Sequence, residues 1–191
     1  MRLPNKRRTT VPEPEKTVSS ERVYEGSRIN VRRDIVSLPD GGTAQRDIVE
    51  HPDAVSIVAV DSDNNVVLVR QYRRAPKLFL LEVPAGVMDP GEEPIQTAQR
   101  ELREETGFAA ATLDFLGDFY TAPGILTERM YAFLATGLTE DALPPDEDED
   151  IEVERVPLAK AMEMARSGEL NDAKSIVSLL MAERRLNGFT G

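Results

Sequence analysis

Runs of apolar residues separated by polar turns predict a chain built mainly from β-strands. Residues 54–60 (AVSIVAV) and 66–72 (VVLVRQY) are joined by a polar turn, which favours a pair of core strands. Further strands are predicted at residues 78–83, 111–119 and 130–138, and directly after residue 150, where Ile151, Val153 and Val156 are spaced by charged residues. Together these runs predict the sheet of one main domain.

Shorter strands precede this core. Residues 22–49 contain several β-type runs, and the sequence PDGG at 39–42 predicts a hairpin turn between two of them. Residues 1–18 are polar, contain proline and lack periodicity, which is typical of a flexible tail. The sequence therefore predicts a tail at 1–18, a small antiparallel sheet at 19–50 and the main domain at 51–191.

The first helix is predicted just after residue 92. Pro94 suits a first helical turn, and Gly107 suits the left-handed position that ends a helix. Ile95, Ala98 and Leu102 share one face of this helix, which predicts that all three are buried.

Two more helices are predicted in the last part of the chain. One runs from Pro157 to Arg166 and stops near Gly168. The other is capped by Asp172 and reaches about Leu186. Its predicted buried face consists of Ile176, Leu179 and Leu180.

The first helix carries three carboxylates that share a face, because Glu101, Glu104 and Glu105 stand at i, i+3 and i+4. Like charges at these spacings repel by roughly 0.2–0.5 kcal/mol per pair, so helix stability alone does not favour them. Hard divalent cations such as Mg²⁺ prefer converging carboxylate oxygens, with water and substrate phosphates completing the shell. The alternative is a solvated acidic face, which is the usual meaning of such clusters in general.

Composition narrows the possible partners. The net charge of -11 argues against nonspecific nucleic-acid binding, so an anionic substrate must be received by local cations or by a metal. The chain has no cysteine, which excludes disulfides and thiol chemistry. No apolar run approaches the ~20 residues that cross a bilayer, and no hydrophobic segment follows the basic N-terminus. We therefore expect a cytoplasmic protein without membrane or nucleic-acid partners.

The segment from residue 86 to residue 108 resembles a complete Nudix box, G-x5-E-x7-R-E-U-x-E-E-x-G-U, where U is a bulky aliphatic or apolar residue. The fixed places are filled by Gly86, Glu92, Arg100, Glu101, Leu102, Glu104, Glu105, Gly107 and Phe108. The resemblance implies a Nudix fold, an α/β/α sandwich with a mixed sheet, here preceded by the small antiparallel sheet. It also implies metal-dependent hydrolysis of a nucleoside diphosphate linked to another group.

The resemblance and the spacing together suggest roles for the box residues. Glu101 and Glu105 are the expected main metal ligands, and Glu104 is expected beside them as a further ligand or as the holder of the attacking water. The resemblance adds the backbone carbonyl of Ala85 as a ligand. Arg100 is expected to orient the helix carboxylates, and Glu92 to tie the preceding loop to the helix. Gly86 and Gly107 complete the structural support.

Segments outside the box resemble the ADP-ribose pyrophosphatases of this family. Pro123 lies sixteen residues beyond Gly107, inside the segment APGILTE, which looks like a loop that meets the terminal ribose. By this resemblance Pro123, Glu128 and Arg46 are expected to bind substrate, and Arg73 to contact a phosphate or ribose. Pro123 alone would equally suit an ordinary turn. The carboxylate of Glu82, within an apolar strand, is expected either at an exposed edge or turned into the binding cleft.

The acidic run at residues 146–150 resembles a late loop of bacterial ADP-ribose pyrophosphatases. Carried over by position, Glu147 is the expected catalytic base and Glu149 an additional metal ligand. Five consecutive acids leave the register open by one or two residues, and a solvated charge run remains the alternative.

The sequence thus predicts a Mg²⁺-dependent hydrolase, with Mn²⁺ as a substitute, that splits ADP-ribose into AMP and ribose 5-phosphate. The alternatives are another nucleoside diphosphate sugar or dinucleotide as substrate, or a Nudix-fold ligand sensor without turnover. The resemblance further implies a homodimer in which the N-terminal sheet pairs two subunits and lends residues to the partner's site.

Overall fold

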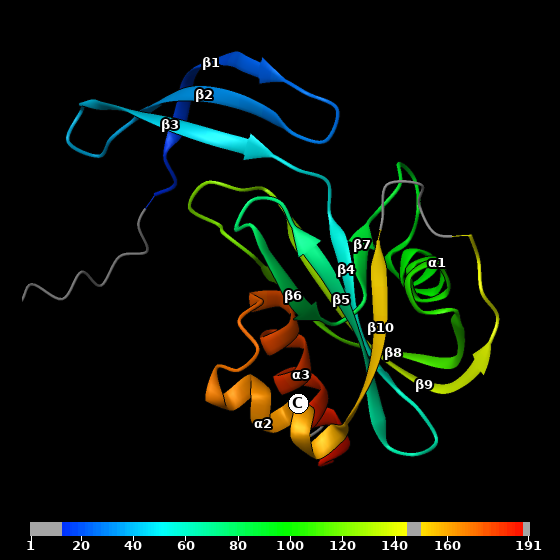
Figure 1. Ribbon diagram of the computed structural model, residues 1–191. Helices are drawn as coiled ribbons and strands as arrows, with labels where there is room; N and C mark the ends of the chain where they lie inside the picture. Colours follow the sequence, from blue (N-terminus) through cyan, green and yellow to red (C-terminus); the bar gives the residue numbers. More distant parts are fainter. Residues whose placement is uncertain (1–12, 145–149, 189–191) are drawn as a thin grey trace, which may run out of the picture. The chain divides into compact units, whose positions relative to one another are not determined.

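A computed structural model describes residues 13–144 and 150–188 of the chain. The chain divides into two compact units (Figure 1). The first unit comprises Met1–His51 together with Gly124–Leu126, and the second comprises Pro52–Pro123 with Thr127–Gly191. No helix among the described residues is both long and apolar enough to cross a membrane.

The first unit is a three-stranded antiparallel sheet in the order β1-β2-β3, as the sequence predicts. Its strands are β1 (Lys16–Glu25), β2 (Asn30–Ser37) and β3 (Thr43–Glu50). β1 starts inside the segment for which the sequence predicts a tail, because backbone pairing with β2 begins at Lys16. Between β2 and β3, Gly41 takes the left-handed conformation (φ 85°) that the hairpin turn requires.

The second unit contains a seven-stranded mixed sheet with the main order β10-β5-β4-β9-β8. β4 and β9 run parallel, whereas the other neighbours pair antiparallel. The strands are β4 (Ala54–Val60), β5 (Asn65–Arg73), β6 (Leu78–Glu82), β7 (Ala85–Val87), β8 (Phe108–Tyr120), β9 (Arg129–Glu140) and β10 (Ile151–Pro157). The sequence predicts all of these except the short β7.

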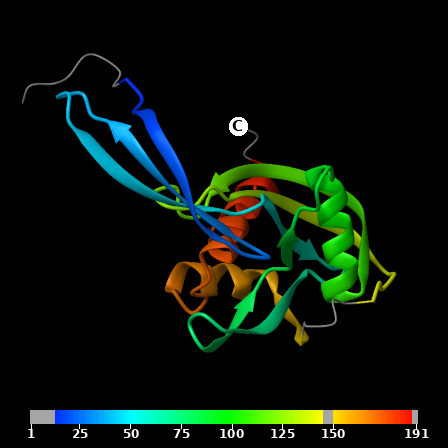
Figure 2. The same cartoon turned by 90° about the horizontal axis from the view of Figure 1, so that it is seen from above.

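Helices cover both faces of this sheet, which gives the predicted α/β/α sandwich (Figures 1 and 2). α1 (Pro94–Thr106) packs on one face, where Ala98 and Leu102 join a core cluster with Ile57. α2 (Leu158–Ser167) and α3 (Ala173–Leu186) pack on the other face.

Two residues predicted to be buried are exposed. Ile95 is 51% exposed, because the buried stripe of α1 is centred on Ala98 and Glu105 and leaves Ile95 at its margin in the first turn. Leu180 is 38% exposed, because α3 turns Ser178 and Leu179 toward the sheet instead. Helical spacing identifies which residues share a face but does not locate the centre of the buried stripe.

The sheet of the second unit opens into a fork between β4 and β5. These strands pair only at Ala59–Val67 and Val60–Val66. Beyond that point β5 pairs with β6, whereas β4 pairs with β7. The Ile57 N–H donates to the Pro84 carbonyl at 2.8 Å and joins the two branches where β6 leads into β7. The fork therefore brings β5, β6 and β7 together beside the helices.

Candidate active site

α1 begins and ends as its sequence requires. The Gln96 side chain accepts a hydrogen bond from the Glu93 N–H at 3.0 Å, and Pro94 occupies the first turn. Gly107 takes the left-handed conformation at φ 77° and donates its N–H to the Arg103 carbonyl at 3.1 Å. These ends fix the register of the helix, and with it the direction of the acidic side chains.

Two carboxylates of α1 pack against β7. Glu105 accepts a hydrogen bond from the Ala85 N–H at 2.9 Å. The Glu101 carboxyl group lies over Gly86, where an added Cβ would stand only 1.9 Å from its carboxyl carbon. Glu101 and Glu105 are 9% and 6% exposed, so the acidic face is part of the buried stripe rather than a solvated one. Gly86 is therefore the residue that lets Glu101 approach the strand.

Arg100 holds three carboxylates of the box together. It donates to Glu92 at 3.0 and 3.1 Å, to Glu101 at 2.7 Å and to Glu104 at 2.9 Å. Its Nη2 also donates to the Val87 carbonyl at 3.1 Å. The hydrogen bond to Glu92 is the main cause that raises the pKa of Arg100, so the guanidinium remains charged. This cation offsets the repulsion among the acids that the helical spacing creates.

Glu92 links the loop before α1 to the helix. It accepts from the Asp89 N–H at 3.2 Å and from the Thr97 hydroxyl at 2.8 Å, besides its contacts with Arg100. These hydrogen bonds, led by that of Arg100, lower the pKa of Glu92 to about 2. Glu92 is thus ionised throughout the neutral range.

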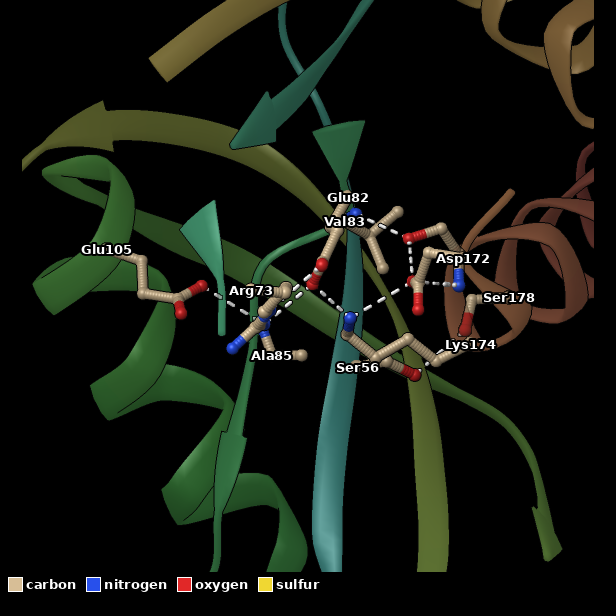
Figure 3. Close-up of polar contacts among 10 residues, drawn as sticks. Ser56, Arg73, Glu82, Val83, Ala85, Glu105, Asp172, Lys174 and Ser178 are labelled. Atoms are coloured by element: carbon tan, nitrogen blue, oxygen red, sulfur yellow. Dashed lines mark hydrogen bonds and ion pairs between the residues drawn. The ribbon is translucent and has the colours of Figure 1, made fainter. Parts of the chain in front are cut away.

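Glu82 does not lie at an exposed edge of the sheet. It is 1% exposed, and Arg73 and Lys174 both contact its carboxylate (Figure 3). Arg73 donates to both oxygens of Glu82, at 2.9 and 2.6 Å. Burial raises the pKa of Glu82, but the hydrogen bonds and charges of Arg73 and Lys174 outweigh burial and lower it overall. The edge-exposed alternative is therefore wrong, and Glu82 is an internal anchor for Arg73.

Lys174 is the residue of this site that sequence reasoning missed. Its partner Glu82 lies 92 positions earlier in the chain, and no local spacing relates the two. Asp172, predicted only as a helix cap, also accepts from the Lys174 amine at 3.0 Å. The sequence feature that could have drawn attention to Lys174 is its position in the first turn of a helix, where the helix dipole disfavours a cation.

The remaining predicted residues lie in other segments. Pro123 and Glu128 lie in the loop between β8 and β9, where Glu128 accepts a hydrogen bond from the Thr121 hydroxyl at 2.6 Å. Arg46 lies on β3 of the first unit, where its Nε donates to Glu15 at 3.1 Å. Glu147 and Glu149 lie outside the described residues.

The donor set around β7 suits a hard cation because it consists of oxygen atoms alone. Glu101 and Glu105 are packed against the strand that carries the Ala85 carbonyl, and the missing side chain of Gly86 leaves the room for this approach. Among residues 13–144 and 150–188, no three acidic or histidine side chains form a metal-binding group by themselves. An ion there would need donors from the backbone, water or substrate, which is how Mg²⁺ is usually bound.

Two family models match successive parts of the chain. A family model described as "NUDIX domain" matches residues 50–179. A second, described as "Nucleoside diphosphate sugar hydrolase N-terminal domain", matches residues 15–49.

Individual relatives match over most of their length. The ADP-ribose pyrophosphatase of Bacillus subtilis is 40% identical over 86% of this chain and 90% of its own. That of Mycobacterium tuberculosis is 41% identical over 91% of this chain and 85% of its own. The GDP-mannose pyrophosphatase of Salmonella arizonae is 34% identical over 71% of this chain and 75% of its own. A solved structure described as an ADP compounds hydrolase superposes with a TM-score of 0.84, at 26% identity, covering 95% of this chain and all of that one.

Proposed function

The chain belongs to the Nudix hydrolase family, and from that premise we propose that it hydrolyses the pyrophosphate bond of ADP-ribose to give AMP and ribose 5-phosphate. The observation that carries the proposal is the placement of Glu101 and Glu105 against β7, together with the charge interaction between Glu105 and the cation Arg73, which are both drawn in Figure 3. The hydrogen bond to Glu82 is the main cause that raises the pKa of Arg73, and the nearby Glu105 carboxylate adds to this shift. Acidic metal ligands beside an arginine suit a substrate that carries a pyrophosphate.

We assign the metal ion to the oxygen donors beside β7. Glu101, Glu105 and the carbonyl of Ala85 would hold Mg²⁺, or Mn²⁺ in its place, with Glu149 as an additional ligand. A bound divalent cation would neutralise the phosphate oxygens and favour ionisation of the attacking water. Arg100 keeps the carboxylates of Glu101 and Glu104 in place through its hydrogen bonds.

In the proposed reaction, Glu147 takes a proton from water as the water oxygen forms a bond to one phosphorus. The bond between that phosphorus and the bridging oxygen breaks, and the bridging oxygen leaves with the other phosphate. Glu104 helps to hold the attacking water. Arg73, fixed by Glu82, binds the phosphate oxygens as their charge increases.

The two ends of the substrate need further contacts. We propose that Pro123 and Glu128 meet the terminal ribose and that Arg46 contributes from the N-terminal segment. The proposed assembly is a homodimer joined through that segment, which spans residues 19–50 and precedes a hydrolase domain at 51–191. The match of a nucleoside diphosphate sugar hydrolase N-terminal domain to residues 15–49 supports this division.

A second candidate is hydrolysis of another nucleoside diphosphate sugar. The similarity to a GDP-mannose pyrophosphatase favours it, because the box supplies the chemistry whereas the flanking loops select base and sugar. Both candidates share the same catalytic groups and differ only in the groups that surround the pyrophosphate.

Product analysis distinguishes these candidates. Purified protein with Mg²⁺ would be incubated with ADP-ribose, ADP-glucose, GDP-mannose, NADH and diadenosine polyphosphates, and the nucleotides released would be separated and quantified. Efficient release of AMP from ADP-ribose, with the other compounds cleaved far more slowly, is the expected result. Glu105→Gln serves as the inactive control. Preference for another compound would overturn ADP-ribose as the substrate but retain the metal site.

A further inference from the structure

The position of Lys174 needs a physical explanation. It is the second residue of α3, directly after Ala173, where the positive end of the helix dipole disfavours a cation. Its side chain is only 13% exposed, and its amine contacts both Glu82 and Asp172. A buried lysine keeps its charge only when such carboxylates compensate for lost water. Lys174 is therefore held in place by these two acids.

Glu82 is shared between two cations. Its Oε1 accepts from Arg73, whereas its Oε2 accepts from Arg73 and from Lys174 (Figure 3). The two cations Arg73 and Lys174 are matched by two carboxylates, Glu82 and Asp172, so these four groups carry no net charge. Asp172 offsets Lys174 from the far side. Lys174 thus keeps the four groups neutral, and without it Arg73, which is 37% exposed, would face both carboxylates alone.

The contacts with Glu82 also determine which edge of the Arg73 guanidinium is available to bind an anion. Arg73 uses Nε and Nη2 for Glu82, which is the bidentate edge of its guanidinium. Within the described residues, no hydrogen bond is formed by Nη1, which belongs to the opposite edge of the guanidinium. An anion can therefore bind Arg73 while Glu82 still holds it.

The start of α3 is attached to the residue after Glu82. Ser175 accepts a hydrogen bond from the Val83 N–H at 2.8 Å, and its hydroxyl donates to Asp172 at 2.6 Å. Asp172 also caps α3 by accepting from the Ser175 N–H at 3.0 Å. Lys174 and Ser175 thus fix the side chain of Glu82 and the backbone of Val83 from one helical turn.

We propose that Lys174 is a positioning residue for the pyrophosphate site. By sharing the charge of Glu82, it holds this carboxylate in place and spares Arg73 from facing Glu82 and Asp172 alone, so that Arg73 can bind a substrate phosphate. Lys174 itself does not contact the substrate. For the identity of that substrate, the inference rests on the proposed function.

The test compares Lys174→Met with wild type, using ADP-ribose and saturating Mg²⁺. Without Lys174, Arg73 alone faces the carboxylates of Glu82 and Asp172, and their net negative charge disfavours a substrate phosphate, so KM is expected to rise about tenfold while kcat falls less than about threefold. Lys174→Arg keeps the cation and is expected to retain most of the affinity. Lys160→Met is the matched control, because this exposed lysine pairs with Glu169 on the surface and should change neither constant.

A double-mutant cycle distinguishes positioning from general loss of structure. In a Glu82→Gln background the carboxylate is gone, so adding Lys174→Met should not raise KM further. Thermal unfolding of every variant shows whether the fold is retained. The inference would be overturned if Lys174→Met raised KM equally in wild type and in the Glu82→Gln protein. It would also be overturned if KM were unchanged in a folded Lys174→Met protein.

A readout without substrate separates this inference from the proposed function. The NMR signal of the Arg73 Nε–H, assigned with Arg73→Lys, reports its bond to Glu82 directly. Lys174→Met should shift this signal, and Lys160→Met should not. If wild type fails to cleave ADP-ribose, the proposed function fails, whereas an unmoved signal in Lys174→Met would refute the positioning role.

Discussion

At the scale of single residues, the site depends on the absence of a side chain at residue 86. Gly86 has no side chain where Glu101 packs, and a Cβ there would stand 2.0 Å from a Glu101 oxygen. Such an overlap cannot be relieved while the carboxylate keeps its place. The glycine that opens the Nudix box is therefore required by contact rather than by backbone conformation.

Gly86→Ala tests this contact. The added methyl group should push the Glu101 carboxylate off β7 and lower kcat by about 100-fold, since misplacement by an ångström can have that effect. Steady-state kinetics and Mg²⁺ titration would measure the change. Gly42→Ala is the control, because its new Cβ would meet only the side chains of Asp40, at 3.1 Å, and Leu38, at 3.8 Å. Normal turnover in Gly86→Ala would contradict the requirement for this close contact.

Features of the site that depend on local spacing could be predicted from the sequence, whereas those that depend on distant segments could not. The spacing of Glu101 and Glu105 predicted a shared face, and α1 shows it. The environment of Glu82 could not be predicted, because its partner Lys174 comes from a helix 92 residues away. The roles of Glu147 and Glu149 remain predictions, since both lie outside the described residues.

At the scale of elements, α1 is joined to its preceding loop by one ion pair that should respond to pH. Glu92 has a pKa of about 2 in the folded protein, below its ordinary value of 4.5. A lowered pKa stabilises the fold above the ordinary value, and this contribution is lost as pH falls from about 4.5 toward 2. The loop and α1 should therefore loosen in acid before the rest of the second unit.

Urea unfolding of wild type and Glu92→Gln at pH 6 and pH 3 measures this effect. The substitution should lower the free energy of unfolding by about 1–2 kcal/mol more at pH 6 than at pH 3, a figure reduced for the partial exposure of Glu92. Arg100→Met, which removes the cation, should diminish the same pH dependence. An equal loss at both pH values would contradict the assigned cause.

The helices also show what periodicity leaves undetermined. Ala98 and Leu102 are buried as predicted, but Ile95 is exposed because acidic side chains occupy the centre of the buried face. In α3 the polar Ser175 and Ser178 are fully buried, since they bond to Val83 and Ser56 across the fork. A hydrophobic pattern cannot reveal a polar residue that is buried for its hydrogen bonds.

At the scale of the whole molecule, the first unit has little interior of its own. Every residue of β1 is exposed, including Val18, Val23 and Tyr24. Of the residues described in that unit, Asp34 and Val36 are the buried ones. A sheet with so small a core gains stability when another surface covers it, which agrees with the proposed homodimer.

Light scattering at several protein concentrations tests the assembly. Wild type is expected at twice the mass of the chain, and Val23→Glu should shift the equilibrium toward monomer by placing a charge on exposed β1. Val153→Glu, on an exposed position of β10, is the control and should leave the mass unchanged. A monomeric wild type at every concentration would refute the dimer.

The fork between β4 and β5 has a consequence for the order in which the protein matures. Its strands are synthesised early, yet Lys174, Ser175 and Ser178, which join them, follow their partners by 92 to 122 residues. A ribosome-bound chain that still lacks α3 would contain the whole acidic box but neither the hydrogen bond to Val83 nor the second cation beside Glu82. Phosphate binding by Arg73 would thus reach its full affinity only after α3 emerges, so that the proposed hydrolysis would become efficient late in biosynthesis.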